Sequence, residues 1–177
     1  MAVTIKQTEA VPSSYPSVPA GLSSAAAALD SDMIWARIEA FIAWRWTARD
    51  VTWIVEGDGE WTAPLTPATV STVEVWESNA WTVTTPPASP LGGYDLPGEG
   101  PYRFTASVGS GTVPAEVNEA FKRLAEYMAE SNDRPGTASY ALKLGEMTEE
   151  IERTPSWLAR AMQYSGAGDL LRKYRRA

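Results

Sequence analysis

The densest group of side chains that could do chemistry in this sequence is a cluster of four carboxylates. It consists of Glu146, Glu149, Glu150 and Glu152. Carboxylate oxygens are the ligands that divalent cations prefer, so a cation site is the first chemistry to consider. Adjacent glutamates such as Glu149 and Glu150 point apart on a helix, and no Asp-x-Asp ladder or histidine completes a ligand set. We therefore interpret the cluster as a solvated acidic face and predict no metal site and no cofactor.

Other catalytic groupings are equally weak. Ser139 and Lys143 are four residues apart and do not match the Ser-x-x-Lys spacing of a nucleophile with its base. Gly57-Asp58-Gly59 and Gly109-Ser110-Gly111 are too short to cradle a phosphate and are explained as turns. The chain has no cysteine and no histidine, which removes thiolate chemistry and the commonest general base. We predict a protein that is not an enzyme, and a carboxylate-based hydrolase is the weakest hypothesis.

The last residues of the chain form a basic and aromatic tail. From Arg160 onward there are five basic residues and one acidic residue, which give a net charge of +4. The whole chain has a net charge of −7, so the residues before Arg160 have a net charge of −11. A cationic tail on an acidic protein favours a partner of opposite charge. Leu170, Leu171 and Tyr174 share one face at helical spacing, which a purely solvated tail does not need. We interpret the tail as a docking segment, and the alternative is a solvated terminus that only aids solubility.

Tryptophan and arginine mix in the segment from Trp35 to Arg49. Aromatic and basic side chains together can bind single-stranded nucleic acid. Acidic residues such as Glu39 and Asp50 are interleaved, however, and both Trp and Arg are enriched at protein interfaces. Contact with another subunit is the better explanation. The candidates for such a contact are Trp35, Trp44, Arg45, Trp76 and Trp81.

The composition fits one domain with extensions. A chain of 177 residues is within the usual size of a single domain, and 44% hydrophobic residues with eight tryptophans can fill a core. Thirteen prolines and thirteen glycines indicate many turns. No apolar stretch approaches the roughly 20 residues that cross a bilayer, and the N-terminus lacks the features of a signal peptide. We expect a soluble protein, made in the cytoplasm, with no membrane partner.

Two amphipathic helices are expected at the centre of the fold. Asp30, Ser31 and Asp32 offer N-cap acceptors for a helix over residues 33–47. Its apolar face is formed by Ile34, Ile38, Phe41, Ile42 and Trp46. A second helix begins at Pro114, and its inner face should pack on the first. That inner face is formed by Val117, Phe121, Leu124 and Met128.

Alternating apolar residues predict antiparallel strands between the two helices. They are Val51, Trp53 and Val55, then Trp61, then Val73 and Val75, then Trp81 and Val83, and finally Tyr102, Phe104, Ala106 and Val108. Gly57-Asp58-Gly59 and Ser78-Asn79-Ala80 are expected to close hairpins between them. The fold class is therefore α+β: two packed core helices with an inserted antiparallel hairpin or meander region.

The two ends of the chain are expected to lie outside this core. Residues 1–20 are rich in Pro and Ser and predict an extended arm that needs a partner to order it. Residues 21–135 form the core, and residues 136–177 form a C-terminal extension. The extension holds a short strand ending at Gly145 and a helix opened by Thr154-Pro155, with Gly166-Ala167-Gly168 before the tail.

This order of elements resembles the head-tail connector (adaptor) proteins of long-tailed phages and gene transfer agents. The resemblance covers most of residues 31–177 and is most specific in the C-terminal part. The matching pieces are Ile38-Glu39-Ala40-Phe41-Ile42, Ala63-Pro64-Leu65, Val70 to Trp76, Tyr102 to Gly111, Val113 to Val117, Arg153-Thr154-Pro155-Ser156-Trp157-Leu158-Ala159-Arg160-Ala161 and Ser165 to Arg176. One departure is that a Pro-rich arm and Ala25 to Ala28 replace the first short helix of the family.

The resemblance implies a structural protein of the virion neck, between capsid and tail. Such a protein forms a homo-oligomeric ring, here expected to be a dodecamer, under the portal protein, and its other end receives the next tail-joining protein, a stopper or tail terminator. DNA passes through the ring without specific binding, which suits an acidic protein. The portal-docking residues are expected to be Trp157, Leu158, Leu170, Leu171, Arg172, Lys173, Tyr174, Arg175 and Arg176. The alternative function is a nucleic-acid-binding module that uses the basic tail.

Overall fold

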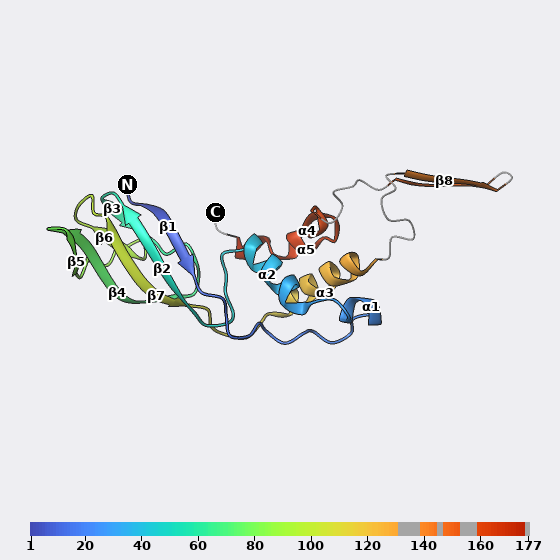
Figure 1. Cartoon of the computed structure of the whole chain (residues 1–177), viewed down its shortest axis with the longest axis horizontal. Coiled ribbons are helices and arrows are strands. Elements are labelled where there is room, and N and C mark those ends of the chain that lie inside the picture. Colours follow the sequence, from blue (N-terminus) through green and yellow to red (C-terminus); the bar gives the residue numbers. More distant parts are fainter. Residues whose placement is uncertain (131–138, 145–146, 153–158, 176–177) are drawn as a thin grey trace. The chain divides into compact units, whose positions relative to one another are not determined.

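The structure, a computed structural model, describes residues 1–130, 139–144, 147–152 and 159–175, the two middle ranges by their backbone (Figure 1). Helices and antiparallel strands are both present, which confirms the predicted α+β class. The chain divides into two compact units. The sheet unit comprises Met1–Pro16, Ile42–Val113 and Tyr174–Ala177, and the helical unit comprises Ser17–Phe41 and Pro114–Lys173. This interleaved division differs from the serial domains 1–20, 21–135 and 136–177, because each unit joins segments that are distant in the sequence.

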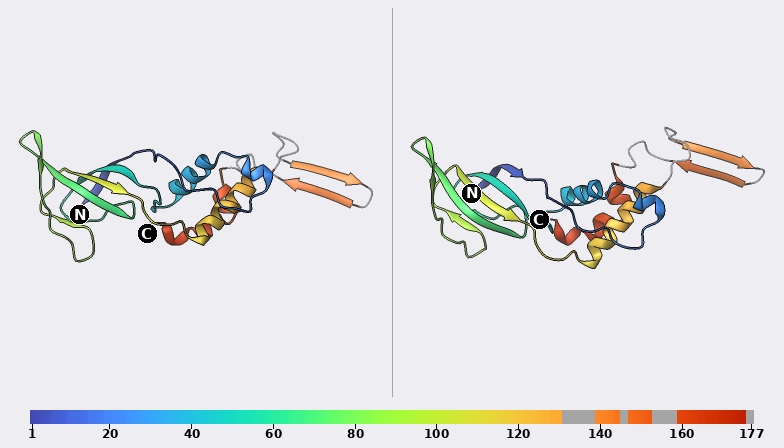
Figure 2. Two further views of the ribbon diagram at one scale, coloured as in Figure 1. Left: turned by 90° about the horizontal axis from the view of Figure 1, so that it is seen from below. Right: turned by 60° about the horizontal axis from the view of Figure 1, so that its bottom comes forward.

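The sheet unit contains seven strands in two sheets. They are β1 (Val3–Glu9), β2 (Arg49–Glu56), β3 (Gly59–Trp61), β4 (Ala68–Glu77), β5 (Ala80–Val83), β6 (Tyr94–Leu96) and β7 (Tyr102–Val108). Five of them form an antiparallel sheet in the order β1-β2-β7-β4-β5, which Figure 2 shows from two further directions. The short strands β3 and β6 pair with each other in a second sheet.

Alternation of apolar and polar residues gives the larger sheet one buried face, as predicted. In β2 the residues Val51, Trp53 and Val55 are at most 1% exposed. In β7 the buried positions are Tyr102, Phe104, Ala106 and Val108. The register pairs Trp53 with Phe104, so the apolar faces of both strands coincide. Trp61 of β3 stacks on Phe104 at 4.1 Å between ring centroids, which packs the small sheet on the large one.

The prediction of an extended arm over residues 1–20 is wrong for its first half. Residues Val3–Glu9 form β1, which pairs with β2 along its length. The Trp53 indole N–H donates to the Gln7 side chain at 2.8 Å, and the Trp61 indole N–H donates to the Thr4 hydroxyl at 2.9 Å. The arm therefore finds its partner within the chain, because its inward polar side chains accept hydrogen bonds from core tryptophans.

One of the two predicted hairpins is present and the other is not. Ser78 and Asn79 have positive φ and close the β4–β5 hairpin. By contrast, the chain after Gly57 leaves the large sheet, because the flanks of β2 are already occupied by β1 and β7. Trp61 then lies on β3 and pairs with Tyr94 of β6.

The helical unit is built on α2 (Ser31–Phe41) and α3 (Ala115–Ala129), the two predicted core helices. Their packing is confirmed by Trp35 and Phe121, whose ring centroids are 4.8 Å apart. Shorter elements complete the unit. They are α1 (Ser24–Ala27), β8 (Ser139–Leu144), β9 (Met147–Glu152), α4 (Ala161–Tyr164) and α5 (Ala167–Leu170), followed by the 3-10 turn η1 (Arg172–Tyr174).

The first core helix is shorter than predicted. The Asp30 carboxylate accepts hydrogen bonds from the backbone N–H groups of Asp32 and Met33, so the predicted N-cap is present. The helix ends at Phe41 instead of residue 47. Beyond it the backbone pairs with other segments, since the Thr66 N–H donates to the Ala43 carbonyl and the Arg45 N–H donates to the Thr66 carbonyl. Trp44 and Trp46 therefore lie outside the helix.

The C-terminal extension follows the predicted outline in part. The expected strand ending at Gly145 corresponds to β8, which pairs with β9 in a separate two-stranded sheet. Glu149, Glu150 and Glu152 belong to β9, whereas Glu146 lies outside the described residues. The predicted helix start at Thr154-Pro155, with Trp157 and Leu158, also lies outside them.

Candidate functional site

The C-terminal tail is the strongest candidate site, and its last described turns are folded. Gly166 has φ +73° and precedes α5, a left-handed conformation that glycine adopts without strain. Its neighbour Ala167 is fully buried and accepts the Leu171 N–H at 3.1 Å. The chain then turns through η1, which brings successive tail side chains to different environments.

Leu171, a predicted docking residue, is buried in the chain's own fold. Its exposed fraction is 0%, whereas Leu170 is half-buried. A partner can therefore contact Leu171 only if the tail leaves its present position. The prediction that Leu171 docks on a partner stays a prediction, and the structure adds this condition to it.

The basic side chains of the tail lie on its exposed side. Arg172 donates to the Asp169 carboxylate at 2.9 Å, and both side chains are more than 70% exposed. Lys173 forms an ion pair with Glu116 of α3. Arg175 is exposed as well, and Arg176 lies outside the described residues. An exposed ion pair such as Arg172–Asp169 contributes little to stability, so Arg172 can exchange this partner for another at low cost.

Tyr174 lies between two tryptophans of the sheet unit. Its ring centroid is 6.0 Å from Trp44 and 5.6 Å from Trp46, both in edge-on geometry. The Tyr174 carbonyl accepts the backbone N–H of Ala43 at 3.0 Å. We call Ala43, Trp44 and Trp46 the aromatic notch. The notch holds the last turn of the chain by one backbone hydrogen bond and two aromatic contacts.

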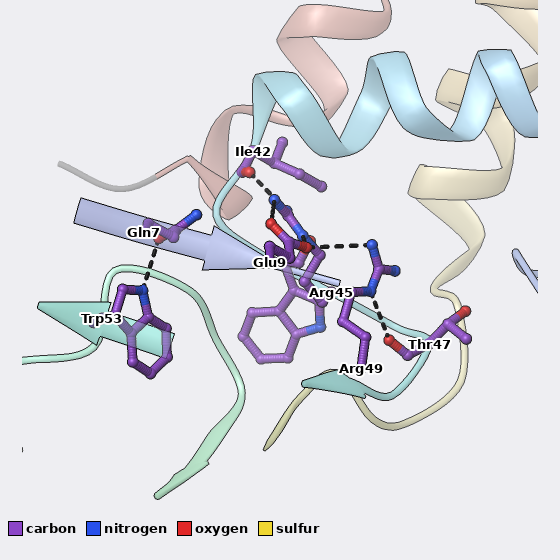
Figure 3. A network of polar contacts seen from close by, with 8 residues as sticks. Gln7, Glu9, Ile42, Arg45, Thr47, Arg49 and Trp53 are labelled. Carbon is purple, nitrogen blue, oxygen red and sulfur yellow. Dashed lines mark hydrogen bonds and ion pairs between the residues drawn. The ribbon is translucent and has the colours of Figure 1, made fainter. Parts of the chain in front are cut away.

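A buried ionic cluster holds the segment that forms the notch (Figure 3). Glu9, at the end of β1, accepts hydrogen bonds from Arg45 Nε at 2.6 Å and Nη2 at 3.1 Å, and from Arg49 Nη1 at 3.2 Å. The Arg45 and Arg49 side chains are only 8% and 4% exposed. Arg45 Nη1 also donates to the Ile42 carbonyl, and Arg49 Nε donates to the Thr47 carbonyl. Both guanidinium groups thus have charged and neutral partners, as buried cations require.

The predicted ring-interface residues fall into two groups. Trp35 is fully buried against Phe121 and Arg45 is buried on Glu9, so their assignment to a surface contact does not fit the structure. Trp35 lies on the apolar face of α2, and Arg45 is drawn inward by the carboxylate. Trp44 is half-buried in the notch. Trp76 is 40% exposed and Trp81 is partly exposed, so these two remain candidates for a subunit contact.

Trp76 and Trp81 lie together on the outer face of the large sheet. They are directly paired across β4 and β5, with ring centroids 5.2 Å apart. The Arg103 guanidinium covers the Trp81 ring at 4.6 Å and binds the Glu74 carboxylate through two hydrogen bonds. The hydrogen bond from Arg103 lowers the pKa of Glu74 and raises the pKa of Arg103. The pair is thus charged and held in a fixed orientation beside the two indoles.

The residues described with side chains contain no group of three or more His, Cys, Asp or Glu that could hold a metal ion. Within the same part of the chain, no helix is long and apolar enough to cross a membrane. The predicted solvated character of the Glu146 to Glu152 cluster stays a prediction, since those side chains lie outside this part.

Sequence reasoning missed two members of the site. The Pro- and Ser-rich composition of residues 1–20 predicts an arm and gives no signal that Glu9 ends a strand and binds two buried arginines. The helical pattern of residues 33–47 predicts that Trp44 and Trp46 lie on a helix, whereas the helix ends at Phe41 and the two tryptophans form the notch beyond it.

No family model matches this chain, and no curated protein or solved structure matches it either.

Proposed function

We propose that the protein is a structural adaptor of the virion neck, joining the portal of the capsid to the tail as a homo-oligomeric ring. Two lines support the proposal: the resemblance of residues 31–177 to head-tail connector proteins, and a folded C-terminal tail with basic residues on its exposed side. The function requires no catalytic group or cofactor. DNA would pass through the ring without specific binding, because the acidic body of the protein carries the same sign of charge as the phosphates.

The single observation that carries the proposal is that the apolar side chains of the tail pack on the chain's own fold while its basic side chains are exposed. Leu171 and Tyr174 attach the tail to the rest of the chain, while Arg172, Lys173 and Arg175 are exposed. A folded turn presents its charges in a fixed arrangement, which favours recognition of one acidic surface over non-specific attraction. We assign that surface to the portal protein.

The outer face of the large sheet is the second contact that an adaptor ring needs. Trp76, Trp81 and Val83 form an apolar region there, and Val83 is 70% exposed. Exposed tryptophans next to an arginine are typical of subunit interfaces. In a closed ring each subunit uses two different surfaces, so this region would meet a different surface of the neighbouring copy.

The test is attachment of tail variants to portal-containing heads. The variant Arg172→Gln, Lys173→Gln, Arg175→Gln is expected to associate more slowly and with less dependence on salt, because steering by opposite charge is lost. A matched control, Arg37→Gln, Lys122→Gln, Arg123→Gln, removes the same charge elsewhere on the helical unit. Co-purification with heads at low and high salt, with a count of tailless particles, compares the two. Equal behaviour of both variants would contradict docking through the tail.

The exposed cations also favour a second candidate function, a module that binds nucleic acid through the tail. Such a module would bind duplex DNA in isolation at low salt, and its affinity would fall steeply as salt is raised. The adaptor has no such requirement. Titration of labelled duplex DNA with the isolated protein separates the two functions, since saturable binding that depends on the tail arginines would support the module.

A further inference from the structure

The aromatic notch has the features of a binding site for a peptide segment. It offers two indole rings, whose centroids are 6.0 Å and 5.6 Å from that of Tyr174 in T-shaped geometry, and one backbone donor, the Ala43 N–H. Aromatic contacts supply affinity for a tyrosine ring, and the backbone donor fixes the position of the main chain beside it. Trp46 is only 6% exposed with Tyr174 in place, so the indole and the tyrosine ring are closely packed.

The walls of the notch are held by interactions that do not involve the tail. Arg45, between the two tryptophans, is bound by Glu9, and its backbone N–H donates to the Thr66 carbonyl at 2.8 Å. The Ser110 N–H donates to the Arg45 carbonyl at 3.3 Å. A segment fixed on both its side-chain and backbone groups keeps its shape when the ligand leaves, which is the condition for a preorganised site.

We propose that Ala43, Trp44 and Trp46 form a binding site for a tyrosine-bearing segment, and that the chain's own Tyr174 occupies it as a releasable latch. The ligand class is a peptide with a tyrosine next to basic residues, here Arg172-Lys173-Tyr174-Arg175. This inference rests on the proposed function in one respect: the segment held by the latch is the one assigned to portal docking.

The latch has a direct consequence for docking. While Tyr174 is in the notch, its ring cannot fill a pocket on a partner. Docking through Tyr174 must therefore compete with the notch, whereas docking through the exposed cations need not. A partner that binds the released tail more tightly than the latched tail shifts the equilibrium toward release.

The test uses the full-length chain with Tyr174→Ala, which empties the notch, and a synthetic peptide of residues 169–177. The peptide is expected to bind this variant saturably, with a change in tryptophan fluorescence. Binding to the wild-type chain should be at least about tenfold weaker, because the notch is filled. A peptide carrying Tyr174→Ala keeps every basic residue and is the matched control. It should not bind, since charge alone does not occupy the notch.

Equal binding of both peptides would overturn the proposal, because it would show attraction by charge only. Binding that survives Trp46→Leu in the Tyr174→Ala chain would overturn it as well. If Tyr174→Ala does not fold, the wild-type chain still decides the matter. Nuclear Overhauser effects between the Tyr174 ring and the Trp46 indole are expected there, and their absence in the folded protein would refute the latch. None of these measurements involves heads or tails, so a failed latch and a failed adaptor function remain distinguishable.

Discussion

At the scale of single residues, Glu9 connects the first strand to the segment that carries the notch. It is the acceptor for two arginines whose side chains are 8% and 4% exposed. A buried cation that loses its carboxylate keeps its desolvation penalty. The stability of the sheet unit and the shape of the notch therefore depend on the same side chain.

We predict that Glu9→Gln lowers the free energy of unfolding by about 3 kcal/mol, since both buried guanidinium groups lose the negative charge of Glu9. Urea denaturation followed by tryptophan fluorescence measures the change. Glu77→Gln, an exposed acid on β4, is the control and should change stability by less than about 0.5 kcal/mol. A loss for Glu9→Gln no larger than that of the control would contradict the role of the ionic cluster.

The tryptophans show how far residue types alone can predict a site. Their type predicted interface contacts, and Trp76 and Trp81 are exposed enough to make them. Trp35 is a residue of the same type, but it is fully buried, because its position on α2 faces Phe121. Which tryptophan is inside depends on the packing of elements that are distant in the sequence, and no local pattern contains that information.

At the scale of elements, the turn after β7 holds the notch segment close to the large sheet. Gly109 has φ +95°, and a Cβ at this position would overlap the carbonyl oxygen of Thr47. Gly111, two residues later, also has positive φ but has open space around it. The two glycines have similar positive φ angles and differ in their surroundings.

Gly109→Ala is accordingly expected to cost about 2 kcal/mol more than Gly111→Ala, because only the first forces the backbone of the notch segment to move. Chemical denaturation of both variants gives the difference. Equal destabilisation would mean that positive φ alone sets the cost and that the close approach to Thr47 is unimportant.

The helical unit has its own joining contact, between α1 and α3. The Glu126 carboxylate accepts hydrogen bonds from the Ser23 backbone N–H at 2.6 Å and the Ser23 hydroxyl at 2.7 Å. The bond from the backbone N–H, and then the bond from the hydroxyl, lower the pKa of Glu126. A carboxyl whose pKa is lower in the folded state stabilises that state at neutral pH, and this stabilisation is lost as the pH falls through the folded pKa.

Glu126→Gln should therefore be less stable than the wild type near neutral pH, and the difference should disappear on acidification. The effect is expected to be small, because the carboxyl is exposed to solvent. Thermal unfolding followed by circular dichroism, from neutral pH down to about pH 3, tests it, with Glu77→Gln as the control. A difference that persists unchanged at the acidic end would rule out the carboxylate as its cause.

Several elements could be predicted from the sequence because their signals are local. The alternation in β2 and β7, the Ser78-Asn79 turn and the face of α3 are examples. The pairing of β1 with β2 and of β3 with β6 could not, since strand partners are chosen by the whole sheet. The end of α2 was also missed, because backbone pairing with Thr66 interrupts a helical pattern that continues in the sequence.

At the scale of the whole molecule, the tail and the first strand belong to the fold of the chain. The side chains of Leu171 and Tyr174 pack on other residues of the same chain. Trp76 and Val83 are among the large apolar side chains that stay exposed. A stable interface needs on the order of 1,000 Å² of buried surface with good complementarity. We therefore expect stable assembly to need the additional contact surface of a partner.

We expect the isolated protein to be monomeric or weakly associated at micromolar concentration. Sedimentation velocity across a range of concentrations measures this. A tight dodecamer formed without the portal would contradict it and would show that the ring closes through surfaces of this chain alone.

The contact between Ser110 and Arg45 has a thermodynamic consequence for the helices. It joins the two ends of the segment Ile42–Val113, which separates α2 from α3 in the sequence. If that segment were unfolded, closing it would cost the helical unit on the order of 4 kcal/mol of chain entropy. The folded sheet unit holds the two ends of this segment together and removes most of this cost. Phe104→Ala should consequently lower the melting temperature of both units, whereas Trp35→Ala should lower only that of the helices.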